Sequence, residues 1–175
     1  MAGLDLSALR VLAIDDNAFS RRLVTAALRA LNVHQIAEAE NAADGFAALR
    51  AFMPDMILLD WVMPEVNGVQ FAKQVRNDRT GNFRYLPIIM TTAYSEIWHV
   101  QQARDAGINE FVVKPFSART LYNKIKTIID NPRPYIDIAD GYFGPDRRRR
   151  TQPVTEDRRK SGPGDGANAT QSPPP

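Results

Sequence analysis

Five short apolar runs alternate with five amphipathic stretches over the first 130 residues, and this alternation restricts the chain to few folds. The apolar runs lie at residues 11–14, 35–40, 55–60, 86–92 and 109–114. The stretches that repeat apolar residues at helical spacing lie at residues 20–31, 41–52, 69–77, 95–107 and 117–130. Three of the five runs are almost continuously apolar, as parallel strands covered on both faces are. The pattern therefore predicts an α/β fold of five β–α units around a doubly wound, parallel five-stranded sheet.

Composition excludes several kinds of site. The chain of 175 residues has no cysteine, which excludes disulfides, thiolate metal sites and cysteine nucleophiles. No apolar run approaches the roughly 20 residues needed to cross a bilayer, because the best run, at residues 56–59, ends at Asp60. The first residues also lack the pattern of a secretory signal. We expect a cytoplasmic protein without membrane insertion.

Acidic, hydroxyl and basic residues stand where the predicted strands end. Asp15 and Asp16 follow the first strand and Asp60 ends the third, while Thr92 ends the fourth and Lys114 ends the fifth. The carboxyl ends of parallel strands meet at one edge of a sheet, so these side chains should converge. Clustered carboxylates repel one another unless a hard cation such as Mg²⁺ neutralises them. Because a lysine and a hydroxyl suit a group that acquires phosphoryl charge, the cluster predicts phosphoryl transfer to a carboxylate.

Each of these residues also has an ordinary structural explanation, since strand-end Asp often caps a loop and surface Lys is usually solvated. Their joint order favours function instead. Over residues 8–130 the chain resembles the receiver domain of bacterial two-component response regulators, above all the CheY-like single-domain proteins. The segments that carry this resemblance are IDDN at 14–17, LLDWVMPEVNG at 58–68, IIMTTA at 88–93 and FVVKPF at 111–116.

The resemblance implies a flavodoxin-like receiver fold for residues 1–130 and a role for each matched residue. Asp60 would accept the phosphoryl group and Lys114 would pair with it. Thr92 would be the switch hydroxyl and Phe111 the switch aromatic, although Phe111 could equally be a core residue. The peptide bond between Lys114 and Pro115 would be cis. The Mg²⁺ ligands would be Asp15, Asp16, Asp60 and the backbone carbonyl of Val62.

The composition changes after Asp130. Residues 1–130 hold 14 basic and 14 acidic side chains, whereas residues 144–160 hold seven basic and three acidic ones, a local charge of +4. Eight of the twelve prolines also follow Asp130, and residues 161–175 contain almost nothing apolar, so we expect that end to be disordered.

The sequence NPRP at 131–134 should end the last helix and turn the chain away from the domain. The Gly–Pro–Asp sequence at 144–146 predicts a turn. We expect the tail to lack a core, so that cutting the chain after Asp130 leaves thermal unfolding nearly unchanged. Docking of residues 135–143 on the helices is the alternative.

Residues 131–160 form an arginine-rich extension with aromatic neighbours. Arginine stacks on rings, pairs with phosphate and bonds the O6/N7 edge of guanine, which suits a small anionic guanine nucleotide. The simpler alternative is a solvated charge run. The residues expected to contact the nucleotide are Tyr142, Phe143, Asp146, Arg147, Arg148, Arg149, Arg150, Arg158 and Arg159.

A receiver followed by GPDRRRR and a second basic cluster resembles the Cle-type CheY-like effectors of alphaproteobacteria. The resemblance implies that the extension binds cyclic di-GMP, becomes ordered on binding and controls a protein partner such as the flagellar motor switch, with recruitment to the flagellated pole. A histidine kinase or phosphotransfer protein would be the phosphodonor. We expect no separate enzymatic activity.

Two other functions fit the same sequence. The chain could be a phosphoryl relay or chemotaxis receiver that acts through Asp60 alone, with a dispensable tail. It could instead attract nucleic acid through the arginines, which would give a steep salt dependence. Nucleic acid is the weaker alternative, because the sequence contains no helix-turn-helix pattern.

Overall fold

The computed structural model describes residues 4–79, 82–93, 97–138 and 141–147, and the account below concerns these residues. Five strands alternate with five helices, as the sequence predicts. The strands are β1 (Arg10–Ile14), β2 (Gln35–Ala39), β3 (Met56–Asp60), β4 (Ile88–Thr92) and β5 (Glu110–Val113). The helices are α1 (Ala18–Ala30), α2 (Ala42–Phe52), α3 (Gly68–Asn77), α4 (Ile97–Asp105) and α5 (Ala118–Asp130), and a short 3-10 helix, η1 (Asn82–Tyr85), precedes β4.

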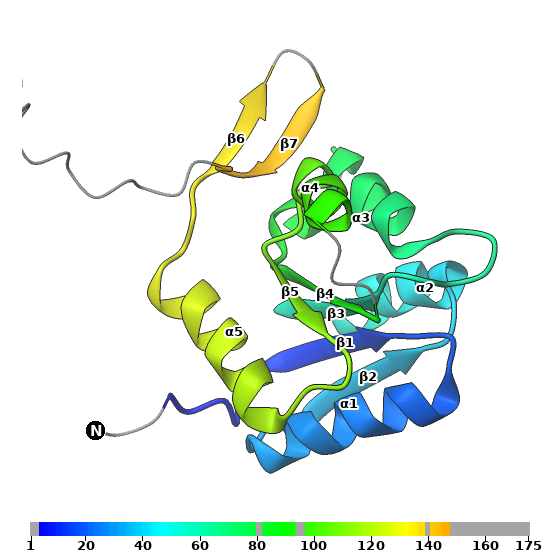
Figure 1. Cartoon of the computed structure of the whole chain (residues 1–175), viewed down its shortest axis with the longest axis vertical. Helices are drawn as coiled ribbons and strands as arrows, with labels where there is room; N and C mark the ends of the chain where they lie inside the picture. Colours follow the sequence, from blue (N-terminus) through cyan, green and yellow to red (C-terminus); the bar gives the residue numbers. More distant parts are fainter. Residues whose placement is uncertain (1–3, 80–81, 94–96, 139–140, 148–175) are drawn as a thin grey trace, which may run out of the picture.

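The five strands form one parallel sheet in the order β2-β1-β3-β4-β5. Helices α1 and α5 cover one face of the sheet, and α2, α3 and α4 cover the other (Figure 1). This arrangement confirms the predicted doubly wound α/β fold. It also brings the carboxyl ends of β1, β3, β4 and β5 to one edge.

Side-chain caps fix where the helices begin. Asn17, Asn41, Asn67 and Ser117 each accept a hydrogen bond from a backbone N–H in the first turn of the helix that follows. Helix α5 ends at Asp130, as predicted from the proline-rich sequence that follows it.

Each face of the sheet has its own apolar core. The core under α2, α3 and α4 contains Phe71, which is fully buried and lies 4.4 Å from the ring of Phe46. The core under α1 and α5 includes the fully buried Leu28 and Ile125. Strands β3 and β4 are buried along their whole length, which explains their uninterrupted apolar sequences.

After α5 the chain forms an antiparallel hairpin of β6 (Tyr135–Ile138) and β7 (Tyr142–Pro145). The hairpin stands beside α3 and α4 (Figure 1). The expectation that the chain turns away after residue 134 is therefore wrong for the hairpin. The prediction of a turn at the Gly–Pro–Asp sequence is also wrong, because Gly144 and Pro145 pair with β6 as part of an extended strand.

Aromatic rings hold the hairpin on the domain. Phe143 lies 5.2 Å from the ring of Tyr85 and 5.6 Å from that of Tyr135, and the guanidinium of Arg84 stacks on Phe143 at 3.4 Å. The Tyr135 hydroxyl donates to the carbonyl of Leu86 at 3.3 Å. Tyr142 is buried, and its hydroxyl donates to the carbonyl of Pro145 at 2.8 Å.

Two glycines allow the close approach of the hairpin. A Cβ on Gly144 would lie 2.7 Å from the Cα of Gly107, and a Cβ on Gly107 would lie 2.9 Å from the carbonyl oxygen of Phe143. Gly107 also has a φ of 78°, which side chains disfavour. The loop between α4 and β5 can therefore contact the hairpin backbone directly.

A buried arginine joins this loop to the hairpin. Arg76 on α3 is 2% exposed and donates twice to the carbonyl of Gly107, at 2.9 and 3.0 Å. It also donates to the carbonyl of Arg84 at 2.9 Å, and its guanidinium lies 5.2 Å from the ring of Tyr135. Burial lowers the pKa of Arg76, and these carbonyls supply the partners that a buried cation needs.

Candidate phosphoryl-acceptor site

The strand ends bring the predicted acidic and basic side chains together. Asp60 is the last residue of β3, Thr92 is the last residue of β4, and Lys114 directly follows β5. Asp15 follows β1 and hydrogen-bonds to β2 through its backbone N–H. Asp15, Asp60 and Thr92 are buried, so the site is a shielded edge of the sheet rather than an open acidic surface.

Lys114 bridges two of the carboxylates. Its Nζ donates to Asp15 Oδ2 at 2.7 Å and to Asp60 Oδ1 at 2.5 Å. Charge-assisted hydrogen bonds of this length are the strong ones. The peptide bond between Lys114 and Pro115 is cis, as predicted.

Burial and the neighbouring lysine have opposite effects on the pKa of Asp60. Burial raises the pKa of Asp60, while the hydrogen bond from Lys114 and its charge act to lower it. For Lys114, burial acts to lower the pKa, but the hydrogen bonds to Asp15 and Asp60 outweigh it and raise the pKa. The two groups thus stabilise each other's charged form.

Three carboxylates can hold a divalent cation here. Asp15, Asp16 and Asp60 each offer an oxygen, and these oxygens lie within 4.8 Å of one another. Hard oxygen donors of this kind fit Mg²⁺. The side chain of Val62 is exposed, and its backbone N–H donates to Asp60 Oδ2 at 3.1 Å. The role of the Val62 carbonyl as a ligand stays a prediction.

The structure adds two residues that the sequence analysis missed. Ser20 on α1 donates its hydroxyl to Asp15 Oδ2 at 2.5 Å, and Arg21 donates to the Asp15 carbonyl at 2.7 Å. Arg21 also pairs with Glu38 at 3.1 Å. Both residues lie in the first turn of α1, five and six residues after Asp15. Their place at the start of the helix that follows the acidic pair was the signal available in the sequence.

The β4 threonines share the edge with Asp60. Thr91 Oγ1 lies 3.5 Å from Asp60 Oδ1, at the limit of a hydrogen bond, while the carbonyl of Thr92 accepts from the Lys114 N–H at 2.7 Å. Gly68 lets the start of α3 lie against the end of β3, because a Cβ there would lie 2.1 Å from the Asp60 carbonyl oxygen. Only glycine fits this position.

Phe111 lies on β5, three residues before Lys114. It is partly buried and packs against the core under α4, and Lys124 Nζ lies 5.4 Å from its ring centroid. Both the switch and the core interpretation of Phe111 agree with this position.

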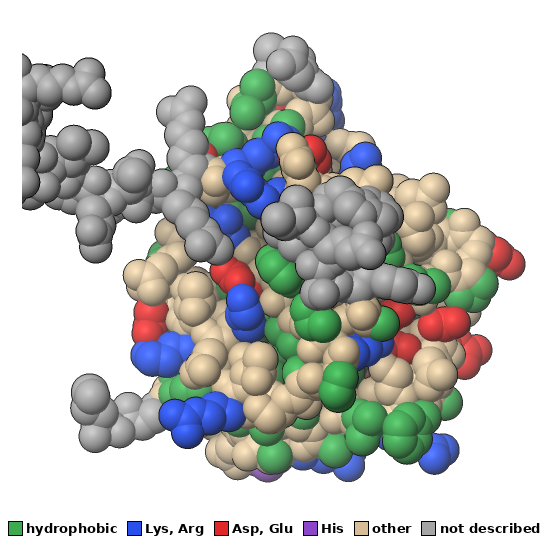
Figure 2. Space-filling model, viewed as in Figure 1, with side chains coloured by type: hydrophobic (Ala, Val, Ile, Leu, Met, Phe, Trp, Pro, Cys, Tyr) green, Lys and Arg blue, Asp and Glu red, His purple; other side chains and the backbone are tan. Residues whose placement is uncertain are grey.

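Four of the ligand residues predicted in the extension lie within the described residues. Tyr142 and Phe143 lie on β7, and Asp146 and Arg147 follow it. The Arg147 guanidinium stacks 3.6 Å from the Tyr142 ring and pairs with Asp105 Oδ1 at 2.8 Å. Lys and Arg side chains gather at the base of the hairpin (Figure 2). Arg148, Arg149, Arg150, Arg158 and Arg159, and the predicted disordered end at 161–175, lie outside the described residues.

Among the described residues, no helix is both long and apolar enough to cross a bilayer.

Comparison with known proteins identifies the domain. Residues 11–126 match the family model of the response regulator receiver domain. The chain is 34% identical over 122 residues to the chemotaxis protein CheY1 of Helicobacter pylori, an alignment that covers 69% of this chain and 97% of that protein. It is 33% identical to the chemotaxis protein CheY of Pseudomonas aeruginosa, over 70% of this chain and 97% of that protein.

Solved structures agree with the sequence relatives. The chemotaxis protein CheY4 of Vibrio cholerae superposes with a TM-score of 0.63 at 27% identity, covering 69% of this chain and 98% of that chain. A probable two-component system response regulator/GGDEF domain protein superposes with a TM-score of 0.64 at 25% identity, over 71% of this chain and 50% of that chain. The family match ends at residue 126, before the hairpin. The chain belongs to the family of response regulator receiver domains.

Proposed function

We propose that the chain is a CheY-like response regulator that accepts a phosphoryl group on Asp60 and binds cyclic di-GMP through its arginine-rich extension. A histidine kinase or phosphotransfer protein would supply the phosphoryl group. The ligand-bound protein would act on a protein target such as the flagellar motor switch, in the cytoplasm and at the flagellated pole.

The first half of the proposal is supported by the contact between Lys114 and Asp60. An Asp60 carboxylate oxygen would attack the phosphorus of the donor, and the donor's leaving group would depart from the opposite side. Lys114 Nζ, 2.5 Å from Asp60 Oδ1, would then pair with the phosphoryl oxygens. Asp15, Asp16 and Asp60 would hold Mg²⁺, which supplies further positive charge to those oxygens. Thr92 would meet the phosphoryl group as its switch hydroxyl.

Replacing Asp60 tests this half. Asp60→Asn should abolish labelling by a small phosphodonor in the presence of Mg²⁺, because the amide cannot form an acyl phosphate. Asp130→Asn, a carboxylate at the end of α5, is the matched control and should be labelled as the wild type is. Persistent labelling of Asp60→Asn would remove Asp60 from the role of acceptor.

The second half is supported by the position of Arg147. Its guanidinium already stacks on a ring, that of Tyr142, in the way that arginine stacks on a base. The carbonyl of Arg147 accepts from Arg104 at 3.0 Å, so the run of arginines starts at the end of α4. Because Arg147 also pairs with Asp105, a nucleotide phosphate would compete with that carboxylate for the guanidinium.

A titration with cyclic di-GMP tests this half. Arg147→Ala combined with Arg148→Ala should weaken binding at least about tenfold, which takes only about 1.4 kcal/mol. Asp60→Asn should bind almost as the wild type does. GTP and a DNA duplex serve as competing ligands. A phosphoryl relay with a dispensable tail would show no binding of cyclic di-GMP, and equal binding of DNA would favour a nucleic-acid role.

A further inference from the structure

Asp15 is held by its neighbours through both its backbone and its side chain. Its backbone N–H donates to the carbonyl of Ala39 at 3.1 Å, and its own carbonyl accepts from Arg21 at 2.7 Å. The side chain is buried, and its Oδ1 accepts from the backbone N–H of Asn17 at 2.9 Å. The remaining freedom of Asp15 is a rotation of its carboxylate, which the donors to Oδ2 restrict.

Two donors of different charge share Asp15 Oδ2. Ser20 Oγ, in the first turn of α1, lies 2.5 Å from this oxygen, and Lys114 Nζ lies 2.7 Å from it. An ionised carboxylate offers about four lone-pair positions, and on Asp15 three of them accept from Asn17, Ser20 and Lys114. Because the hydroxyl is neutral, Ser20 can hold the oxygen without repelling a cation bound beside it.

Asp60 offers a comparison at the same edge of the sheet. Lys114 Nζ lies 2.5 Å from Asp60 Oδ1, much as it lies beside Asp15. Thr91 Oγ1 lies 3.5 Å from the same Asp60 oxygen, at the limit of a hydrogen bond. The contact between Ser20 and Asp15 is therefore a short hydrogen bond, whereas the contact between Thr91 and Asp60 is marginal.

Phosphoryl transfer would remove one of the donors to Asp15. When Lys114 pairs with the phosphoryl oxygens, as the proposed function requires, its hydrogen bond to Asp15 is weakened. Ser20 then remains as a donor to Asp15 Oδ2 and maintains the orientation in which oxygens of Asp15, Asp16 and Asp60 lie within 4.8 Å of one another. Loss of such a partner behind a metal ligand typically lowers metal affinity about 10–100-fold.

We propose that Ser20 is a positioning residue of the phosphoryl-acceptor site. It orients Asp15 for Mg²⁺ in two stages: before transfer, when Lys114 contacts the same oxygen, and after transfer, when Lys114 has moved to the phosphoryl group. The second stage rests on the proposed function. The first does not, because the acidic cluster and the contact with Ser20 exist without a phosphoryl group.

Titration of the full chain with Mg²⁺, followed by the backbone NMR signals of Asp15 and Asp16, tests the first stage. Ser20→Ala should raise the Kd for Mg²⁺ at least about tenfold, and Ser20→Thr, which keeps a hydroxyl, should restore it to within about twofold. Ser7→Ala is the matched control, because it removes a serine hydroxyl before β1, beside Asp5, and should leave the Kd unchanged. An unchanged Kd in Ser20→Ala would overturn the inference, as would the absence of Mg²⁺ binding by the wild type.

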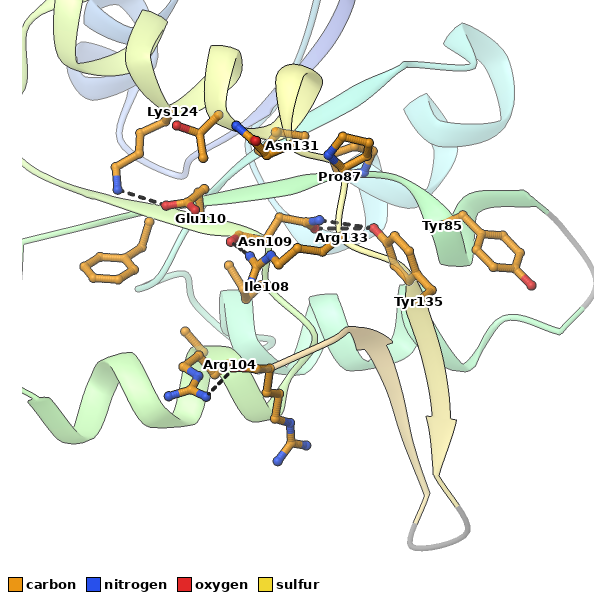
Figure 3. Close-up of a pocket in the computed structure, with 16 residues that line it drawn as sticks. Tyr85, Pro87, Arg104, Ile108, Asn109, Glu110, Lys124, Asn131, Arg133 and Tyr135 are labelled. Carbon is orange, nitrogen blue, oxygen red and sulfur yellow. Dashed lines mark hydrogen bonds and ion pairs between the residues drawn. The ribbon is translucent and has the colours of Figure 1, made fainter. Parts of the chain in front are cut away.

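The same samples separate positioning from a loss of structure. The Glu110 signal should stay still during the titration, because this carboxylate pairs with Lys124 at 2.9 Å in a pocket that neither Asp15 nor Asp60 lines (Figure 3). Where Ser20→Ala does not fold, Ser20→Thr and Ser20→Val make the same comparison, because threonine and valine have similar shapes and differ in the hydroxyl. Equal Mg²⁺ affinity of these two variants would overturn the inference.

Labelling by a small phosphodonor tests the second stage. In Ser20→Ala, the Mg²⁺ concentration for half-maximal labelling should rise at least about tenfold, while labelling in saturating Mg²⁺ stays within about twofold of the wild type. An equal loss of labelling at every Mg²⁺ concentration would contradict the positioning role. If the wild type is not labelled, or Asp60→Asn is labelled, the proposed function fails, and the Mg²⁺ titration still decides whether Ser20 orients Asp15.

Discussion

The five β–α units and the β6–β7 hairpin are two parts of one molecule that are stabilised in different ways. The β–α body has two continuous apolar cores, in which whole strands such as β3 and β4 are buried. The hairpin packs against this body through three rings and through Arg76 and Arg84. A core of aliphatic side chains leaves a periodic pattern in the sequence, whereas contacts between arginine and aromatic rings leave none.

The largest expected effect is in the body. Phe71→Ala should lower the free energy of unfolding by about 3–5 kcal/mol, because the ring is fully buried against Phe46 and its loss opens a cavity. Chemical denaturation measures this change. The NMR signals of the hairpin should disappear in the same transition, since β7 packs against α3 and loses this contact when the body unfolds. A loss below about 1 kcal/mol would mean that the core repacks freely around the position.

A smaller effect is expected in the hairpin. Phe143→Ala should lower the free energy of unfolding by about 1–2 kcal/mol, because it removes the stacking partner of Arg84 and the ring contacts with Tyr85 and Tyr135. Ile138→Ala is the matched control on the same hairpin, because Ile138 is 42% exposed and should change stability little. Equal, near-zero effects of both substitutions would mean that the hairpin contributes nothing to the fold.

These two substitutions also separate what the sequence predicts from what it does not. The alternation of runs such as residues 86–92 with helical stretches is enough to place every strand of the main sheet, because burial on both faces demands apolar residues there. Asp60 and Lys114 are predicted for a related reason, since strand ends in a parallel sheet converge. The topology of the sheet is therefore enough to predict most residues of the candidate site.

The hairpin could not be predicted from local sequence patterns. Prolines and glycines around residues 131–145 are typical of a loop, and the segment is too short and polar to bury a core alone. Its folding depends on partners far away in the chain, such as Arg76 and Gly107, which create a surface that only the folded body presents. Ser20 and Arg21 were not predicted because polar residues are common in the first turn of a helix, whatever they contact.

The two strands of the hairpin and the β–α body form one structured unit in the described residues, and backbone ¹⁵N relaxation of the full chain measures this directly. We predict heteronuclear NOE values for Tyr135–Ile138 and Tyr142–Pro145 equal to those of β4 and α3, together with ring contacts between Phe143 and Tyr85 in NOE spectra. Values that fall steadily after Asp130, with no contact between those rings, would contradict it.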